Sequence, residues 1–271
     1  MVNAIKKFIQ KFYLGIMLLF LYAPILILIV LSFNKSKSRS KWGGFTLDWY
    51  RSLFESSDLL TALYNTLLIA LLSALGATLL GTMGAIAINR MRKSTRTIMM
   101  SITNIPMLNA EIVTAISLML LFIAVREFIP NFQLGFLSVL VSHITFNIPY
   151  VILSVSPKLK QTDRSTYEAA MDLGASPIMA FFKVVLPDIM PGILSGFLLA
   201  FTMSLDDFVI THFTKGPGLD TLSTKIYAET RKGIQPEIYA LSTILFGAVF
   251  LLLVLVNLRK DKNQADAKPR R

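Results

Sequence analysis

The sequence predicts an all-α integral membrane protein with six transmembrane helices, and the length of its apolar runs is the main reason. Leu14 to Phe33 is a run of 20 residues without a charged side chain, and Leu59 to Asn89 is a run of 31. A bilayer core about 30 Å thick is crossed by roughly 20 apolar helical residues, so each run is long enough to span it. The runs are continuous rather than alternating, which disfavours a transmembrane β-barrel.

Four further apolar stretches follow along the chain. Glu111 interrupts the third span, and Asp206 and Asp207 interrupt the fifth. The other polar residues in the spans are mostly Ser, Thr, Asn and Gly, which suits helices that pack closely in lipid. We expect a single transmembrane domain over 1–271, with spans at 13–33, 62–89, 98–125, 135–156, 189–211 and 238–258.

The first span follows a basic segment with Lys6, Lys7 and Lys11, as a secretory signal peptide would. It is longer than the usual apolar region of a signal peptide, and no small-residue cleavage pattern follows it. We therefore expect this segment to be retained as a membrane span.

The chain is strongly basic, with 27 Lys and Arg against 16 Asp and Glu, and it has no Cys. The lack of Cys excludes a disulfide framework, a thiolate metal site and a cysteine nucleophile. If the N-terminus is cytoplasmic, 17 of the Lys and Arg residues lie in inner segments and 10 in outer segments. The positive-inside rule therefore predicts that both termini are cytoplasmic. We expect the basic segment after Leu258 to stop transfer and to meet anionic lipid headgroups rather than nucleic acid.

The inner segment between the fourth and fifth spans carries signals for two short helices. Thr162 and Asp163 can cap the first helix, and a glycine that tolerates a left-handed conformation stops it. A Ser-Pro pair starts the second helix, and a later proline closes it. We predict a helix–turn–helix elbow over 160–187, marked by Thr162, Asp163, Gly174, Ser176, Pro177 and Pro187.

The elbow also carries the residues of a known motif. Glu168-Ala169-Ala170, then Gly174, then Leu186-Pro187 are similar to the pattern EAA-x3-G-x9-I-x-L-P, with Val184 at the Ile position. That pattern marks the membrane subunits of ATP-binding-cassette (ABC) importers.

Over residues 12–258 the chain resembles one subfamily of these importers, the spermidine/putrescine permeases of the PotC type. Glu111 departs from the subfamily, which often has Asp there. The resemblance is carried by Leu21-Tyr22-Ala23-Pro24-Ile25, Trp49-Tyr50, Ser142-His143-Ile144-Thr145-Phe146, Asp172-Leu173-Gly174-Ala175, Ser204-Leu205-Asp206-Asp207 and Lys225-Ile226-Tyr227.

The resemblance implies the type I importer permease fold, a bacterial cell membrane location and transport by alternating access. It implies three kinds of partner: an ATPase dimer, a second related permease subunit, and an external polyamine-binding protein. The elbow would dock on the ATPase, with Glu168 as a polar contact and Ala169 and Ala170 allowing close approach. The chain itself has no G-x-x-x-x-G-K-[ST] stretch, so it would be a non-catalytic subunit without a cofactor, and the partner ATPase would bind ATP and Mg.

The cargo is indicated by the acidic residues within the spans. A carboxylate at the bilayer centre costs about 2.5–3.5 kcal/mol, and the spans contain no Lys or Arg to pair with one. Uncompensated acids suit a cationic guest, and aromatic faces add cation–π contacts to its ammonium groups. The candidate pathway residues are Glu111, Asp206, Asp207, Tyr22 and Trp49, with Phe208 as a further aromatic candidate.

Other roles are open for some of these residues. Neighbours on one helix point about 100° apart, so at most one of Asp206 and Asp207 faces the pathway directly. The other could cap a broken helix or bind Ser and Thr hydroxyls across an interface. For His143 we expect a hydrogen bond between packed helices rather than a proton relay.

Other functions are also open. The same architecture could carry another cationic or metal-complexed solute. A proton-coupled secondary transporter would usually have more spans and no reason for the elbow. An intramembrane hydrolase would need a catalytic constellation that the two His residues and the adjacent Asp pair do not form.

Overall fold

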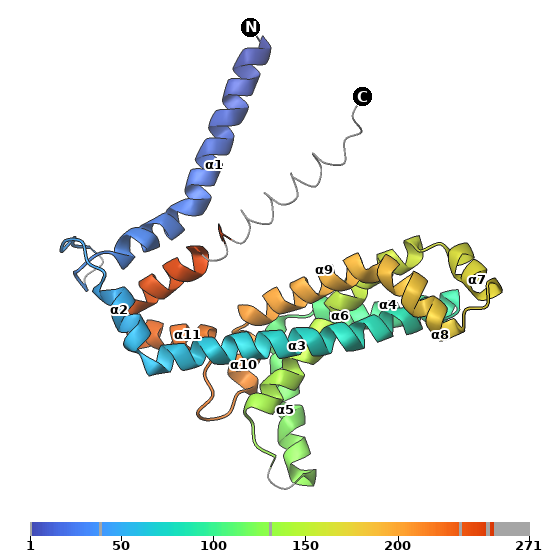
Figure 1. Ribbon diagram of the computed structural model, residues 1–271. Coiled ribbons are helices and arrows are strands. Elements are labelled where there is room, and N and C mark those ends of the chain that lie inside the picture. The colour runs from blue at the N-terminus through green and yellow to red at the C-terminus, as the bar shows by residue number, and fades with distance from the viewer. Residues whose placement is uncertain (1, 38–39, 130–131, 233–234, 248–249, 252–271) are drawn as a thin grey trace. The chain divides into compact units, whose positions relative to one another are not determined.

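A computed structural model of the chain describes residues 2–37, 40–129, 132–232, 235–247 and 250–251 (Figure 1). Every named element in these residues is a helix, and the only β-type pairing among them is an isolated bridge between Asn34 and Phe45. The chain divides into two compact units, Met1–Leu60 with Ile226–Arg271, and Thr61–Lys225. The two units are described separately below.

The first unit contains the long apolar helix α1 (Val2–Ser32) and the short helix α2 (Asp48–Glu55). Asn34 organises the loop between them, because its Nδ2 donates to the Lys41 carbonyl and its Oδ1 accepts from the Ser36 and Gly43 N–H groups. Later in the chain, residues 236–247 of this unit are also helical.

The second unit contains most of the helices. Its central helix is α6, which packs along α9. Its elements are α3 (Ser57–Arg90), α4 (Lys93–Leu108), α5 (Glu111–Phe128), α6 (Phe136–Gln161), α7 (Arg164–Asp172), α8 (Pro177–Ala180), the π-helix η1 (Phe181–Val185), α9 (Leu186–Leu205), α10 (Val209–Thr214) and the start of α11 (Leu222–Lys232).

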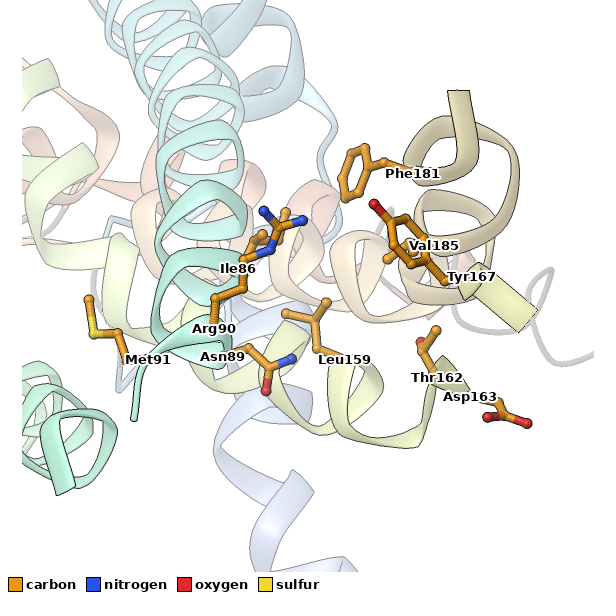
Figure 2. Close-up of a pocket in the computed structure, with 10 residues that line it drawn as sticks. All are labelled: Ile86, Asn89, Arg90, Met91, Leu159, Thr162, Asp163, Tyr167, Phe181 and Val185. Carbon is orange, nitrogen blue, oxygen red and sulfur yellow. The ribbon is translucent and has the colours of Figure 1, made fainter. Parts of the chain in front are cut away.

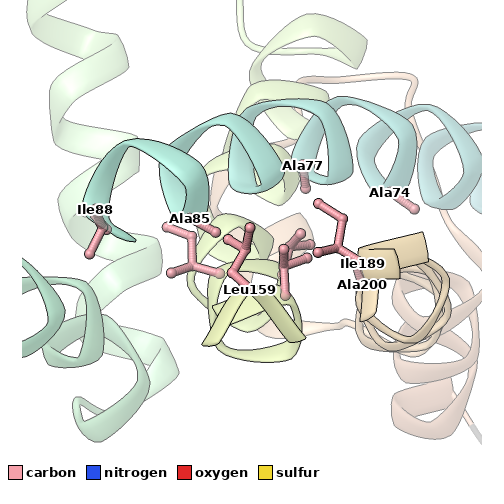
Figure 3. Packing of buried hydrophobic residues seen from close by; sticks show 10 residues of the cluster. Ala74, Ala77, Ala85, Ile88, Leu159, Ile189 and Ala200 are labelled. Atoms are coloured by element: carbon pink, nitrogen blue, oxygen red, sulfur yellow. The ribbon is translucent and has the colours of Figure 1, made fainter. Parts of the chain in front are cut away.

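Small residues allow α3 and α9 to approach α6 closely. In one buried cluster, Ala74, Ala77 and Ala85 of α3 pack against α6 and α9 residues such as Val151 and Ile189 (Figure 3). A Cβ at Gly81 of α3 would lie only 2.7 Å from the Val151 Cβ. Between membrane helices the apolar side chains gain nothing by leaving lipid, so such close backbone packing is what holds them together.

Four helices in the described residues are long and apolar enough to cross a membrane, or five if a bent pair counts as one span. They include residues of the first, second, fourth and fifth expected spans. Of the sixth expected span, 238–258, the structure describes 238–247 and 250–251, which are helical, and the rest lies outside the described residues. The four helices are Gln10–Ser32, Ser57–Arg90, Phe136–Gln161 and Pro177–Leu205.

Two expected spans are broken rather than continuous. The third, 98–125, is divided into α4 and α5, which are bent by 100° at Asn109 and Ala110. The fifth, 189–211, stops at Leu205 and resumes at Val209 as α10. Breaks within membrane helices are tolerated where other groups satisfy the freed backbone, and acidic residues stand at both breaks.

Candidate transport pathway and coupling loop

The break in the fifth span contains Asp206 and Asp207. Asp207 accepts hydrogen bonds from the Ile210 N–H (3.3 Å), the Thr211 N–H (2.8 Å) and the Thr211 hydroxyl (2.9 Å). Its Oδ2 also lies 3.3 Å from Nε2 of His143. Asp207 therefore caps α10 and binds a Thr hydroxyl, as one of the alternatives from the sequence requires.

The expectation that Asp206 and Asp207 are neighbours on one helix is wrong, because α9 ends at Leu205 and Asp206 is its C-cap. The break leaves N–H groups at the start of α10 without partners in a preceding turn, and the carboxylate of Asp207 accepts hydrogen bonds from two of them. Asp206 is exposed, whereas the Asp207 side chain is only 6% exposed. The two acids thus differ sharply in environment.

The break in the third span places Glu111 at the first turn of α5, where it is exposed. A carboxylate at the start of a helix is stabilised by the partial positive charge of the unpaired N–H groups. Glu111 also interacts electrostatically with Tyr150 of α6. Tyr150 in turn packs against Phe146, with the rings tilted by 57° and their centroids 5.5 Å apart.

The two breaks are joined by helix packing. Ala115 of α5, Phe146 of α6 and Ile210 of α10 form one buried cluster, with Tyr150 and Phe213 packed against it. The helices that begin after each break, α5 and α10, therefore pack together. Acidic groups at the ends of interrupted helices have the chemistry to bind a cation, and aromatic faces add cation–π contacts.

Tyr22 and Trp49 belong to the first unit, whereas Glu111, Asp206 and Asp207 belong to the second. Tyr22 is 43% exposed on α1. Trp49 lies in α2, and its indole Nε1 donates to the Asn34 carbonyl at 2.8 Å. This bond ties α2 to the loop after α1, where Tyr50 also contacts the Ser32 hydroxyl at 2.7 Å.

The first helix of the predicted elbow has the expected caps. Asp163 accepts from the Ser165 N–H at the start of α7, and this bond lowers the pKa of the Asp163 carboxyl below its usual value. At the other end, the Gly174 N–H donates to the Met171 carbonyl and the Ala175 N–H to the Ala170 carbonyl. This pair of bonds is a Schellman motif, and Gly174 takes the left-handed conformation it requires, with φ of +92°.

The second helix begins as expected, with the Ser176 hydroxyl accepting from the Met179 N–H and Pro177 in the first turn. The prediction that Pro187 closes it is wrong. The helix continues through a π-turn into α9, and the Leu186 N–H bonds to the Phe181 carbonyl five residues earlier. Pro187 therefore lies in the first turn of α9, directly after the π-turn, within a helix that does not stop there.

The elbow exposes large apolar side chains although it lies outside the expected spans. Leu173 is 89% exposed and Ile178 is 72% exposed, and Met179 and Phe182 are also exposed nearby. Glu168 and Ala169 are exposed on α7. Leu186, in contrast, packs against the cluster between α3, α6 and α9, so it anchors α9 rather than extending the exposed surface.

A pocket of about 680 Å³ lies beside the elbow (Figure 2). Tyr167 of α7 and Phe181 of η1 line one part of it, and the end of α3 lines another. In Figure 2 the carboxylate of Asp163 points away from the pocket. The elbow helix α7 packs chiefly on η1 and α8, which continue directly into α9. The pocket residues are Ile86, Asn89, Arg90, Met91, Leu159, Thr162, Asp163, Tyr167, Phe181 and Val185.

Sequence reasoning missed three residues at the pathway breaks: Tyr150, Ser204 and Thr211. His143 was expected to form a helix-packing hydrogen bond and does so, to Ser204 and Thr211, but its acidic neighbour Asp207 was not expected. One available signal was that Thr211 follows Asp207 by four residues, about one helical turn, a spacing at which two side chains can meet. In the described residues no group of three or more His, Cys, Asp or Glu side chains is placed to hold a metal ion.

Comparisons with known proteins match most of the chain to membrane components of transport systems. Residues 77–259 match the family described as "Binding-protein-dependent transport system inner membrane component". The putrescine transport system permease protein PotI of Escherichia coli (strain K12) is 42% identical over 85% of this chain and 83% of its own length. The spermidine/putrescine transport system permease protein PotC of the same strain is 38% identical over 91% of this chain and 92% of its own length.

Among solved structures, a chain of a bacterial ABC transporter involved in the import of the acidic polysaccharide alginate has a TM-score of 0.73. It covers 96% of this chain and 99% of its own length at 21% identity. A second structure of the alginate transporter, in complex with a periplasmic protein bound to an alginate pentasaccharide, has a TM-score of 0.70 at 21% identity, and covers 93% of this chain and 94% of its own length. At these identities the likeness concerns the fold.

Proposed function

Because the chain belongs to the family of inner membrane components of binding-protein-dependent transport systems, we propose that it is a permease subunit of an ABC importer for polyamines. Two relatives that align with most of the chain are named as putrescine and spermidine/putrescine permeases, which supports a polyamine cargo. The subunit is non-catalytic, and it takes its cargo through the membrane by alternating access.

The acids at the helix breaks supply the cation-binding chemistry. Spermidine and putrescine are flexible chains of ammonium groups separated by methylenes, so separated carboxylates can bind successive charges. Glu111 and Asp206 are exposed at the two breaks, and the helices that follow those breaks pack together. Tyr150 beside Glu111 adds an aromatic face. Tyr22 and Trp49 are further proposed contacts on the pathway.

The elbow is the contact with a partner ATPase. Its exposed Leu173 and Ile178 can enter an apolar cleft, and Glu168 can add a polar contact at the same surface. Ala169, Ala170 and Gly174 keep the backbone of this surface accessible, while Leu186 and Pro187 attach it to α9. The ATPase binds the ATP and Mg that drive transport, and this chain holds no cofactor of its own.

Closure of the ATPase dimer would move α9 through this contact. Pro177–Leu205 forms a continuous helical rod of 29 residues from the elbow to the break at Asp206. At 1.5 Å per residue such a rod is about 43 Å long. Because α7 packs on η1 and α8, a push on the elbow is carried into α9 and reaches the pathway at its far end.

The remaining partners are a second, related permease subunit and an external polyamine-binding protein. The chain is a multi-pass protein of the bacterial cell membrane, and we place both termini in the cytoplasm because the inner segments then carry 17 of the 27 Lys and Arg residues. The single domain over 1–271 and the six spans are part of the same proposal.

Stimulation of ATP hydrolysis by candidate solutes tests the cargo. The chain, its ATPase, the second permease and the binding protein are reconstituted in nanodiscs, and ATPase rates are compared with putrescine, spermidine, arginine and a metal–citrate complex. We expect polyamines to stimulate hydrolysis severalfold and the other solutes to have no effect. Stimulation by a metal complex or another cationic solute, with none by polyamines, would leave the importer class intact and replace the cargo.

A further inference from the structure

The break in the fifth span is held by a buried chain of polar side chains from four helices. His143 of α6 is 2% exposed, and its Nδ1 lies 2.5 Å from the Ser204 hydroxyl of α9. Its Nε2 lies 2.9 Å from the Thr211 hydroxyl of α10 and 3.3 Å from Asp207. The Ser204 hydroxyl also accepts from Ser73 of α3 at 2.9 Å.

Counting the available hydrogens assigns a donor and an acceptor to each hydrogen bond among these buried side chains. The Thr211 hydroxyl donates to the Asp207 carboxylate, so it has no second hydrogen for His143. Nε2 of His143 must therefore carry a hydrogen and donate to Thr211. Because Ser204 accepts from Ser73, its own hydrogen is available for Nδ1 of His143. With the Ser73 hydroxyl donating to Ser204 at 2.9 Å rather than to the Ala70 carbonyl at 3.2 Å, each donor in this assignment is used once.

The same contacts occupy the carboxylate of Asp207. Oδ1 accepts from the Ile210 N–H, and Oδ2 accepts from the Thr211 N–H and hydroxyl and lies beside His143. A carboxylate with this many donors is satisfied without a guest. Asp206, one residue earlier and exposed, has no such enclosure.

We infer that His143 is a positioning residue, which fixes the break between α9 and α10 by holding Thr211 and Asp207, so that Asp206 is the acid of the pair presented to the cation. Asp207 is then a structural clamp. The role of Asp206 rests on the proposed polyamine transport, whereas the clamp itself concerns only the helix break.

Amide hydrogen exchange and uptake together test the inference in the assembled complex. Exchange of the Ile210 and Thr211 N–H groups reports the clamp, and spermidine uptake gives the KM and the maximal rate. H143F removes both ring contacts, so we expect these amides to exchange roughly tenfold faster and the maximal rate to fall. H143Q keeps a donor near the position of Nε2 and should restore much of both.

His212 provides the matched control. It lies on α10 beside Thr211, but its exposed ring stacks on Phe208 rather than entering the buried chain. H212F should therefore leave both measurements unchanged. D207N should accelerate exchange, whereas D206N should raise the KM roughly tenfold with exchange unchanged. If H143F does not assemble, T211V removes the shared hydroxyl and should accelerate exchange of the Ile210 N–H.

Unchanged exchange in both H143F and T211V, or equal damage from H143F and H143Q, would overturn the clamp. A KM effect from D207N with normal exchange would overturn the division of roles between the two acids. If the unaltered complex takes up no polyamine, the proposed cargo fails, and the exchange measurements still decide whether His143 holds the break.

Discussion

Gly174 shows how a single residue shapes the coupling elbow. Its φ of +92° allows the chain to turn sharply after α7 and to close the two hydrogen bonds of the Schellman motif. Apart from its two chain neighbours, no described residue has an atom within 4 Å of the place where a Cβ would be, so the requirement for glycine is conformational rather than steric. The turn exposes Leu173 at the end of α7, and it leads directly to the cap of the next helix.

Replacing Gly174 tests this requirement. G174A should destabilise the turn by about 1–2 kcal/mol, because a β-carbon disfavours the left-handed conformation. The Gly174 and Ala175 N–H groups should then exchange with solvent roughly 5–30 times faster. G174N is the matched variant, since Asn tolerates this conformation better than Ala, and its exchange rates should lie between the two. Equal rates in G174A and the unaltered protein would contradict a conformational role for the glycine.

At the same scale, the sequence allows the caps of the elbow to be predicted but not the clamp at the fifth break. Asp163, Gly174 and Ser176 act on backbone groups within a few residues, so local spacing is sufficient to identify them. The partners of His143 lie in other helices far along the chain, and only the packing of α6 against α9 and α10 brings them together. For the same reason the environments of Asp206 and Asp207 could not be distinguished from sequence.

At the scale of elements, α3 and α9 are held against α6 by glycines that replace side chains at the contacts. A Cβ at Gly81 would approach the Cβ of Val151 to 2.7 Å and the carbonyl of Ile148 to 3.2 Å. A Cβ at Gly76 would approach only the flexible tip of Ile144, at 2.9 Å. The two positions lie on the same helix, so they differ mainly in what surrounds them.

G81A should therefore destabilise the protein more than G76A. The first change forces α3 away from the α6 backbone and should cost about 1–3 kcal/mol, whereas the second is absorbed by a rotation of Ile144. Thermal unfolding in detergent, followed by near-ultraviolet circular dichroism, measures the difference. Equal midpoints for the two variants would show that the close contact at Gly81 does not determine the packing of α3 on α6.

Element types were predictable because long apolar runs have few alternatives to membrane helices. The residues at which the helices stop were harder to predict. Hydropathy does not register the 100° bend at Asn109 and Ala110 or the end of α9 at Leu205. The acids at both positions were noticed as charges, but their proximity to helix breaks depends on backbone geometry that apolar composition does not encode. Pro187 misled for a related reason, since proline ends one helix and begins another equally well.

At the scale of the whole molecule, the basic residues and the acids proposed to bind the cargo lie in different parts of the sequence. The excess of 27 Lys and Arg over 16 Asp and Glu belongs to the segments outside the expected spans, where we propose that it sets the orientation in the membrane. The expected spans themselves contain acids and no Lys or Arg. A continuous helix, Pro177–Leu205, connects the exposed elbow to the break at Asp206, so the proposed ATPase contact and the proposed pathway lie at the two ends of one helix.

Uptake of labelled spermidine into proteoliposomes tests the central claim most directly. The vesicles contain this chain, its ATPase and the second permease, with binding protein outside and ATP or an imposed proton gradient as the energy source. We expect uptake with ATP alone, and a loss of roughly tenfold or more in L173E, which places a charge on the exposed apolar surface of the elbow. Uptake driven by a proton gradient without ATP, and unaffected by L173E, would contradict the account.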